Sequence, residues 1–166
     1  MEEDPDAGIE EAAFASELMA ATELAFRVIR SAGLSPEDAA DALQEASVRA
    51  WRHRSSRRGA FGPWFVAIAY REARRPRRRW LTMPAFWTIR AEGAPPDEMS
   101  DDIAASLLAL PRRQRIALSL RYEADMSTAA VAQVMHISEP AAKQLLARAR
   151  DSLRRSLAAT ATTVTS

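Results

Sequence analysis

Apolar residues recur at three- and four-residue steps along most of the chain, which is the spacing of amphipathic α-helices. Phe14, Leu18 and Val28 lie on one such stripe, and Leu145 and Leu153 lie on another near the other end. No segment shows the convincing two-residue alternation of a half-buried strand. The pattern therefore predicts an all-α protein.

The first helix is expected to end at Gly33, and the next is expected to begin with Ser35 as its N-cap and Pro36 at its first position. Small residues dominate the inward face of this second helix, which implies close packing. The inward positions are Ala39, Leu43, Ala46 and Ala50, and the outward ones are Asp41, Gln44, Glu45, Val48 and Arg52.

A basic loop at 52–60 leads to a third helix that begins at Phe61 and is expected to end or kink at Pro76. Its predicted buried face is Phe61, Trp64, Phe65 and Ile68, while Tyr70, Arg71 and Arg74 are predicted to point elsewhere.

Three prolines and an acidic second half mark residues 81–100 as a linker, although its apolar residues indicate that part of it docks. We therefore expect two small helical domains, at 10–80 and 101–158. The tail at 159–166 has no core-forming pattern and is expected to be frayed and disordered.

Residues 128–147 fit a helix-turn-helix, with Ser127 and Ser138 as N-caps and His136 at the turn, a position that favours left-handed backbone. Any three-helix bundle contains similar geometry, so the basic helix that follows strengthens the case for DNA binding. The side chains predicted to face outward on the recognition helix are Glu139, Lys143, Gln144, Ala147 and Arg148.

Charge changes this picture, because the net charge of +1 hides alternating blocks. Residues 1–45 and 91–111 are acidic, whereas residues 46–90 and 112–166 are basic. The basic blocks predict two surfaces for polyanions, and the acidic ones predict surfaces for other partners. Near the first basic block, Tyr70 is a candidate platform for stacking a single-stranded base, although an ordinary partly packed surface tyrosine is the alternative.

Composition argues against catalysis and membrane insertion. The chain has no cysteine and only two histidines, His53 and His136, so we expect no catalytic residues, metal site or cofactor. Its longest apolar runs are too short to span a bilayer, and its N-terminus is acidic. We expect a cytoplasmic protein.

The order of these segments resembles a known family. PEDAADALQEASVRAWR, FGPWFVAIAYREARRPRRR, LPRRQRIALSLRY and the final KQLLARARDSLRRSL follow one another as in bacterial sigma factors of the extracytoplasmic-function (ECF) type. The resemblance spans about residues 12–158. It implies a subunit that directs RNA polymerase to promoters, reads the −35 element as duplex, and captures the melted −10 strand.

The resemblance also implies roles and partners for individual residues. The partners would be the RNA polymerase core enzyme, promoter DNA and an anti-sigma factor, and Asp97 and Glu98 of the linker would thread toward the polymerase channel. The implied core-polymerase contacts are Asp41, Gln44, Glu45 and Arg49; the implied −10 contacts are Arg57, Arg58, Phe61, Tyr70, Arg71 and Arg74; the implied −35 contacts are Thr128, Lys143, Gln144, Arg148 and Arg150.

The chain departs from the family pattern at four places that bear on promoter choice. Arg71 stands where asparagine is usual, and Pro76 interrupts a helix that usually continues. His136 replaces the turn glycine, and Pro140 with two alanines replaces the usual start of the recognition helix. The resemblance therefore leaves the promoter sequence open.

Three other readings compete with a promoter-specificity subunit. A sigma-like decoy that sequesters an anti-sigma factor would not need the basic block at 46–90. A two-domain repressor would leave the acidic face around Asp41 unexplained. An enzyme would need a nucleophile–base pair, a metal cluster or a phosphate-cradling glycine loop, and none is visible in the sequence.

Overall fold

The computed structural model describes residues 5–75 and 101–164. Within these two ranges every regular element is a helix, which confirms the predicted all-α class. The predicted linker at 81–100, with Asp97 and Glu98, lies outside the described residues, and so does Pro76.

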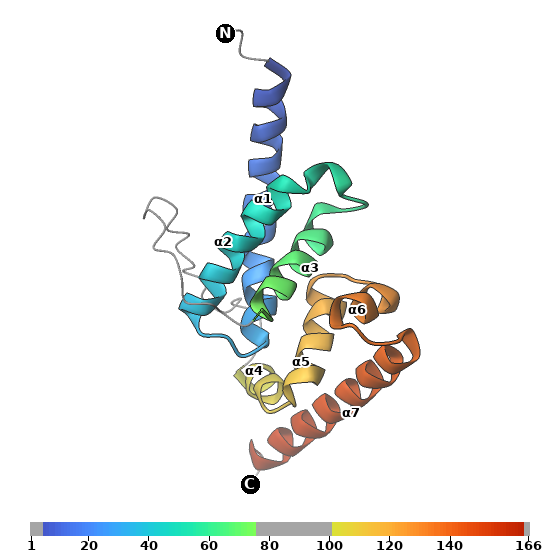
Figure 1. Ribbon diagram of the computed structural model, residues 1–166. Coiled ribbons are helices and arrows are strands. Elements are labelled where there is room, and N and C mark those ends of the chain that lie inside the picture. Colours follow the sequence, from blue (N-terminus) through green and yellow to red (C-terminus); the bar gives the residue numbers. More distant parts are fainter. Residues whose placement is uncertain (1–4, 76–100, 165–166) are drawn as a thin grey trace.

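Three helices form the N-terminal half: α1 at Pro5–Ser31, α2 at Pro36–Arg52 and α3 at Phe61–Ala73, with a short 3-10 turn, η1, at Arg54–Ser56 (Figure 1). Ser35 caps α2 as predicted, because its side chain accepts a hydrogen bond from the Asp38 amide at 3.0 Å. The predicted inward residues of α2 are all buried, and their small size lets α2 pack closely on α1 and α3.

Helix α3 is the most deeply buried element of this half. Phe65, Val66 and Ala69 are completely shielded from solvent although they point to different sides of the helix. The reason is that α3 packs against α1 and α2 on one side and against a helix of the C-terminal half on the other.

The C-terminal half contains α4 at Asp101–Leu108, α5 at Arg112–Leu118, a π-helical turn, η2, at Ser119–Glu123, α6 at Thr128–Met135 and α7 at Glu139–Val164. Ser127 and Ser138 accept hydrogen bonds from the amides three residues later, as expected of N-caps. Leu120 and Val131 are fully buried between these helices.

The final helix is longer than the sequence predicts. Helix α7 continues to Val164, so the prediction of a frayed tail at 159–166 is wrong for residues 159–164. Ala158 and Ala159 still have bonding partners. Residues 159–164 contain two alanines, three threonines and one valine. Threonine and valine are weak helix formers, but an established helix is extended at little cost, so the tail needs no core-forming pattern of its own.

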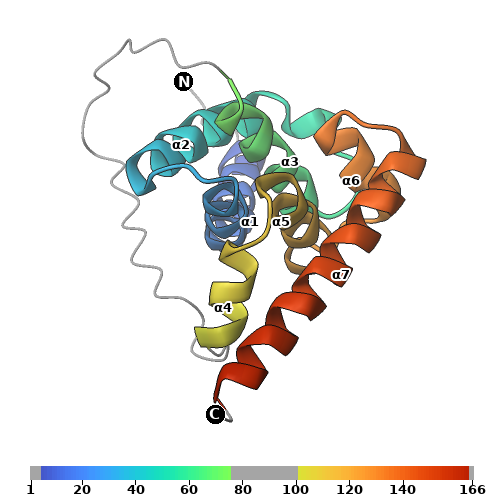
Figure 2. The ribbon, with the colours of Figure 1, turned by 90° about the horizontal axis from the view of Figure 1, so that it is seen from below.

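The two halves pack against each other and share one hydrophobic core. Helix α1 contacts α5 and η2, and α3 contacts α6. Figure 2 looks along α1 and shows α5 beside it, with α7 flanking the C-terminal half. Contacts between helices of the two halves therefore fix their relative position.

The turn between α6 and α7 provides a test of local strain. His136 has φ 53° and ψ 50°, the left-handed conformation that the sequence predicts there. Replacing a non-glycine residue in this conformation by glycine relieves steric strain but adds entropy to the unfolded chain. We expect His136→Gly to raise the free energy of unfolding by about 0.5–1 kcal/mol in urea denaturation.

The matched control is His53→Gly, because His53 has φ −111° and gains no such relief. This control should leave the free energy of unfolding unchanged or lower it. A loss of stability in His136→Gly equal to that of the control would show that His136 is not strained.

Candidate nucleic-acid interface

Helices α6 and α7 form a helix-turn-helix. Ala132 is buried where the helices approach each other, and its carbonyl accepts a hydrogen bond of 3.0 Å from the Ile137 amide. The left-handed His136 between them redirects the chain, and Ser138 then opens α7. The local sequence thus fixes both the end of one helix and the start of the next.

The exposed face of α7 presents groups that hydrogen-bond to bases and phosphates. Lys143, Gln144 and Arg148 are exposed, as predicted for a reading face. The Lys143 ammonium lies 3.4 Å from a carboxylate oxygen of Glu139, an exposed pair that DNA phosphates could displace. Thr128, at the start of α6, is half-buried.

Arg150 lies two turns after Lys143 on α7, so the two side chains leave nearly the same side of the helix. Its Nη1 is 3.5 Å from the Tyr122 hydroxyl of η2, and it lines an apolar hollow of about 630 Å³ between α1, η2 and α7. Leu107 and Leu157 also line this hollow. The structure therefore brings Thr128, Lys143, Gln144 and Arg148 to the helix-turn-helix but places Arg150 beside the hollow.

The outer face of α2 carries the acidic side chains that the sequence predicts there. Asp41 and Glu45 are exposed, and Gln44 is half-buried. Arg49 is held at the edge of this face by a 2.6 Å ion pair with Glu72 of α3. The other Glu72 oxygen lies 3.1 Å from Arg75. Arg49 therefore ties α2 to α3.

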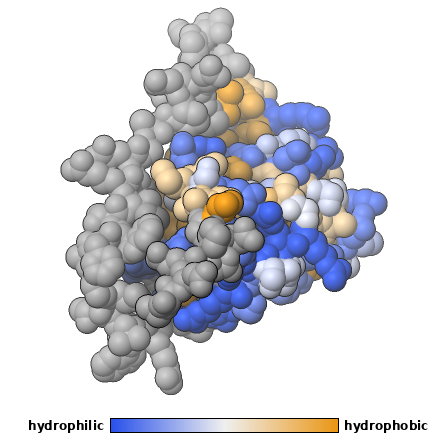
Figure 3. Space-filling view, turned by 90° about the horizontal axis from the view of Figure 1, so that it is seen from above, coloured by the Kyte–Doolittle hydropathy of each residue, from blue (hydrophilic) through white to orange (hydrophobic). Residues whose placement is uncertain are grey.

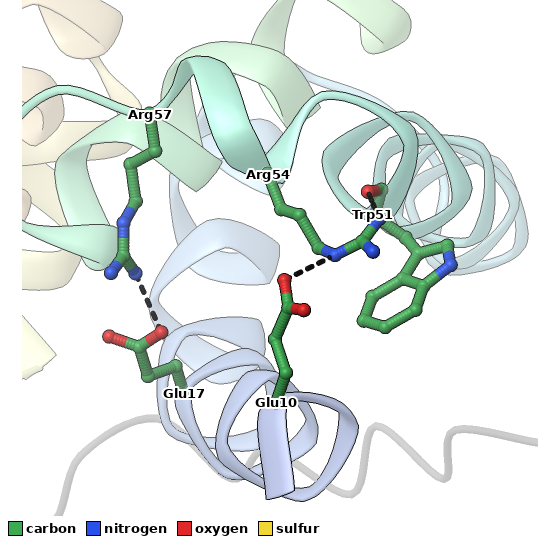
Figure 4. Close-up of polar contacts among 5 residues, drawn as sticks. All are labelled: Glu10, Glu17, Trp51, Arg54 and Arg57. Atoms are coloured by element: carbon green, nitrogen blue, oxygen red, sulfur yellow. Dashed lines mark hydrogen bonds and ion pairs between the residues drawn. The ribbon is translucent and has the colours of Figure 1, made fainter. Parts of the chain in front are cut away.

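Acidic residues of α1 hold the basic loop between α2 and α3. Glu10 pairs with Arg54 at 2.8 Å, and Glu17 pairs with Arg57 at 2.6 Å (Figure 4). The Arg54 guanidinium also lies 3.9 Å from the centre of the Trp51 ring and donates to the Trp51 carbonyl. Sequence reasoning missed these pairs, although the acidic block of α1 was the available signal.

Phe61 sits in an aromatic cluster rather than on an open surface. Its ring centroid lies 5.4 Å from that of Phe14, 5.5 Å from Trp64 and 5.8 Å from Phe65. The residue is 7% exposed. This agrees with its predicted place on the buried face of α3, and Arg57 covers it with a guanidinium 5.5 Å from the ring centre.

Tyr70 is buried, and the prediction that it points outward is wrong. It is 5% exposed, because α3 is covered by the C-terminal half on the side where the sequence indicates a free face. Arg71 and Arg74 of the same helix are exposed as predicted. The Arg74 guanidinium lies 5.8 Å from the Tyr70 ring centre.

Arginine and glutamate side chains join the two halves. Arg115 of α5 donates from Nε to the Ser31 carbonyl at 2.7 Å and from Nη1 to the Leu108 and Leu110 carbonyls at 2.9 and 3.3 Å. Arg27 of α1 lies 3.5 Å from Glu123 of η2. Arg115 thus supplies donors to the last carbonyls of α1 and α4 and to a carbonyl in the turn after α4.

Among the coloured residues seen from above, hydrophilic ones predominate and apolar ones emerge in small groups (Figure 3). Among the described residues no three histidine, aspartate or glutamate side chains come together as a metal site. None of the described helices is both long and apolar enough to cross a membrane.

Family models match both halves of the chain. The model described as Sigma-70 region 2 matches residues 20–80, and the model described as Sigma-70, region 4 matches residues 100–153. No curated protein matches the chain.

Two solved structures are similar to the chain. One is the sigma factor RpoE in complex with the anti-sigma factor NepR from Bartonella quintana, with 20% identity, a TM-score of 0.60, and coverage of 87% of this chain and 96% of that one. The other is a structure of the RsbN–BldN complex, with 24% identity, a TM-score of 0.36, and coverage of 89% and 94%. The similarity to the RpoE structure supports the fold described above for this chain.

Removing the Arg115 guanidinium tests the contact between the halves. Arg115→Leu leaves three backbone carbonyls without their donor, and we expect it to lower the free energy of unfolding by about 1–3 kcal/mol in urea denaturation. Arg113→Leu in the same helix is the control, because the Arg113 side chain is exposed and has no ion-pair partner within the described residues. Equal effects of the two substitutions would contradict the assigned role of Arg115.

Proposed function

The chain is a sigma factor of the extracytoplasmic-function type, and from this premise we propose which of its residues bind the polymerase core and which bind each promoter element. The assignment rests on region 2 and region 4 matches to successive halves of one all-α chain. A sigma factor directs RNA polymerase to specific promoters and initiates transcription there. A decoy without promoter activity is not favoured.

We propose that the domain at 101–158 reads the −35 element as duplex DNA. The observation that supports this is the exposed Lys143, Gln144 and Arg148 on the second helix of a helix-turn-helix. Arginine and glutamine side chains pair with guanine and adenine edges in the major groove. Thr128 would contact the DNA backbone, and Arg150 would reach it from the flank of α7.

We propose that the domain at 10–80 binds the polymerase core and captures the melted −10 strand. Asp41, Gln44, Glu45 and Arg49 would supply the polymerase contact on the outer face of α2. The candidates for the strand are Arg57, Arg58, Phe61, Tyr70, Arg71 and Arg74. The arginines of this set are exposed, whereas the Phe61 and Tyr70 rings are buried.

Capture of a base by Tyr70 therefore requires the halves to separate. Separation of α3 from α5 and α6 would uncover the ring beside Arg71 and Arg74, and stacking of one base is worth about 1–3 kcal/mol. Binding to polymerase would supply the free energy of separation, because polymerase holds the two domains at the distance between the promoter elements. Isolated chain should bind promoter DNA weakly.

We infer a regulator of transcription rather than an enzyme, acting in the cytoplasm where polymerase and DNA are. An anti-sigma factor is a proposed partner, in line with the complex of RpoE with NepR. The linker at 81–100 would thread toward the polymerase channel.

The experiment that tests the function is in vitro transcription with core polymerase on a library of genomic fragments, with start-site mapping. A sigma factor yields discrete start sites that depend on the added chain. Core binding without any start site would identify a decoy, and DNA binding without core binding would identify a repressor.

Charge reversal tests the proposed polymerase contact. Asp41→Lys together with Glu45→Lys should weaken binding to core polymerase, because it opposes a basic partner surface with like charge. The control is Glu11→Lys together with Asp151→Lys, which makes the same change in net charge at exposed positions on α1 and α7. Affinity measured by fluorescence anisotropy should fall only in the first variant; identical affinities would refute the assigned face.

Arg148→Ala tests base reading by α7. If Arg148 reads a base, the substitution should reduce transcription from promoters that carry the matching base pair and leave mismatched promoters almost unchanged. The free-energy difference between matched and mismatched promoters should shrink by about 1–3 kcal/mol. Arg155→Ala, two turns further along the same exposed face, is the control. An equal loss on all templates would assign Arg148 to phosphate contact instead.

A further inference from the structure

A basic cleft lies where the two halves meet, and its C-terminal side, with Arg112 and Arg113, has no role in the proposed function. Its volume is about 520 Å³. We call it the interdomain cleft, and its lining comes from α3, α5 and the turn after α6. The lining residues are Tyr70, Ala73, Arg74, Arg112, Arg113, Ile116, Met135, His136 and Ile137.

The described residues that line the interdomain cleft carry positive charge from both halves, and none of them is acidic. Arg74 comes from the N-terminal half, and Arg112 and Arg113 come from the C-terminal half. All three are exposed, and none forms an ion pair with another residue in 5–75 or 101–164. By contrast Arg49, Arg54 and Arg57 are each paired with a glutamate.

Like charges that converge without counterions repel one another, so the packed arrangement is weakened at this cleft unless an anion enters it. Arginine is suited to phosphate, because its planar guanidinium donates two parallel hydrogen bonds to a phosphate group. Three arginines around one hollow match a ligand with several phosphate groups better than a single carboxylate. The volume lies within the range of small-ligand pockets, about 300–1,000 Å³.

We propose that the interdomain cleft binds a small polyphosphate, either free or as the 5′-triphosphate of a nucleotide. Arg74 would hold it from one half, and Arg112 and Arg113 would hold it from the other. Exposed His136 at the rim would add a further donor.

A ligand that contacts both halves binds the packed arrangement and not the separated one, and it therefore stabilises the packed arrangement. Tyr70 stays covered while the ligand is bound. The ligand would thus oppose promoter opening. This last consequence rests on the proposed function, whereas binding itself does not.

The direct test is isothermal titration calorimetry of the full chain with tripolyphosphate, with adenosine and guanosine triphosphates, and with sulfate at equal ionic strength. We expect tripolyphosphate or a nucleoside triphosphate to bind at one site per chain and sulfate to bind at least about tenfold more weakly. Tighter binding of a nucleotide than of tripolyphosphate would show that the base is also held. Equal binding of sulfate, or no saturable site, would overturn the proposal.

Variants on each side of the cleft locate the site. Arg74→Gln alone, and Arg112→Gln with Arg113→Gln, should each weaken binding at least about tenfold. The control is Arg148→Gln with Arg155→Gln, which removes two exposed arginines outside the cleft. If the control weakens binding as much as the cleft variants, binding is nonspecific attraction to basic surface and the proposal fails.

Arg115→Leu tests the link to the packed arrangement, because Arg115 does not line the cleft but joins the halves. It should weaken polyphosphate binding while the charges of the cleft stay intact. Unchanged affinity in a folded Arg115→Leu chain would show that the ligand does not depend on the packing. None of these binding measurements needs polymerase. A negative result would therefore contradict the ligand proposal without contradicting the proposed function, and a negative transcription result would leave the ligand proposal intact.

Discussion

The burial of α3 between the two halves is the constraint on which the rest of the structure depends. One side of this helix completes the core of α1 and α2, and the other side contacts α6. A second contact between the halves joins α1 to α5, where Arg115 donates a hydrogen bond of 2.7 Å to the Ser31 carbonyl. Because core and interface share one helix, the surface that we propose for the −10 strand cannot be fully open while the halves stay packed.

Arginine serves two different purposes in this chain. Arg49, Arg54 and Arg57 are paired with glutamates and hold helices and the basic loop in place. Arg71 and Arg148 are exposed and lie where nucleic acid is proposed to bind. The alternating charge blocks of the sequence therefore have two origins: ion pairs between α1 and the basic loop, and proposed surfaces for polyanions. Only the positions of the side chains in the structure distinguish paired arginines from exposed ones.

Much of the local structure could be predicted from the sequence. Ser35, Ser127 and the left-handed His136 lie where capping and turn chemistry place them, because those signals act within a few residues. Tyr70 could not be placed, because periodicity reveals one buried face of α3 but not the second face that another domain covers. The contact of Arg150 with Tyr122 could not be predicted either, because Tyr122 belongs to a distant element; the −35 role of Arg150 stays a prediction.

We infer that the two halves are packed in the free chain and separate when promoter DNA is engaged. The chain contains no cysteine, so Ser55→Cys in η1 and Ala129→Cys in α6 allow two fluorophores to be attached specifically. The measurement is the energy transfer between them, in the free chain and in the open complex with polymerase and promoter. We predict high transfer in the free chain and low transfer in the open complex. Equal transfer in both states, with transcription proceeding from the same sample, would contradict the account.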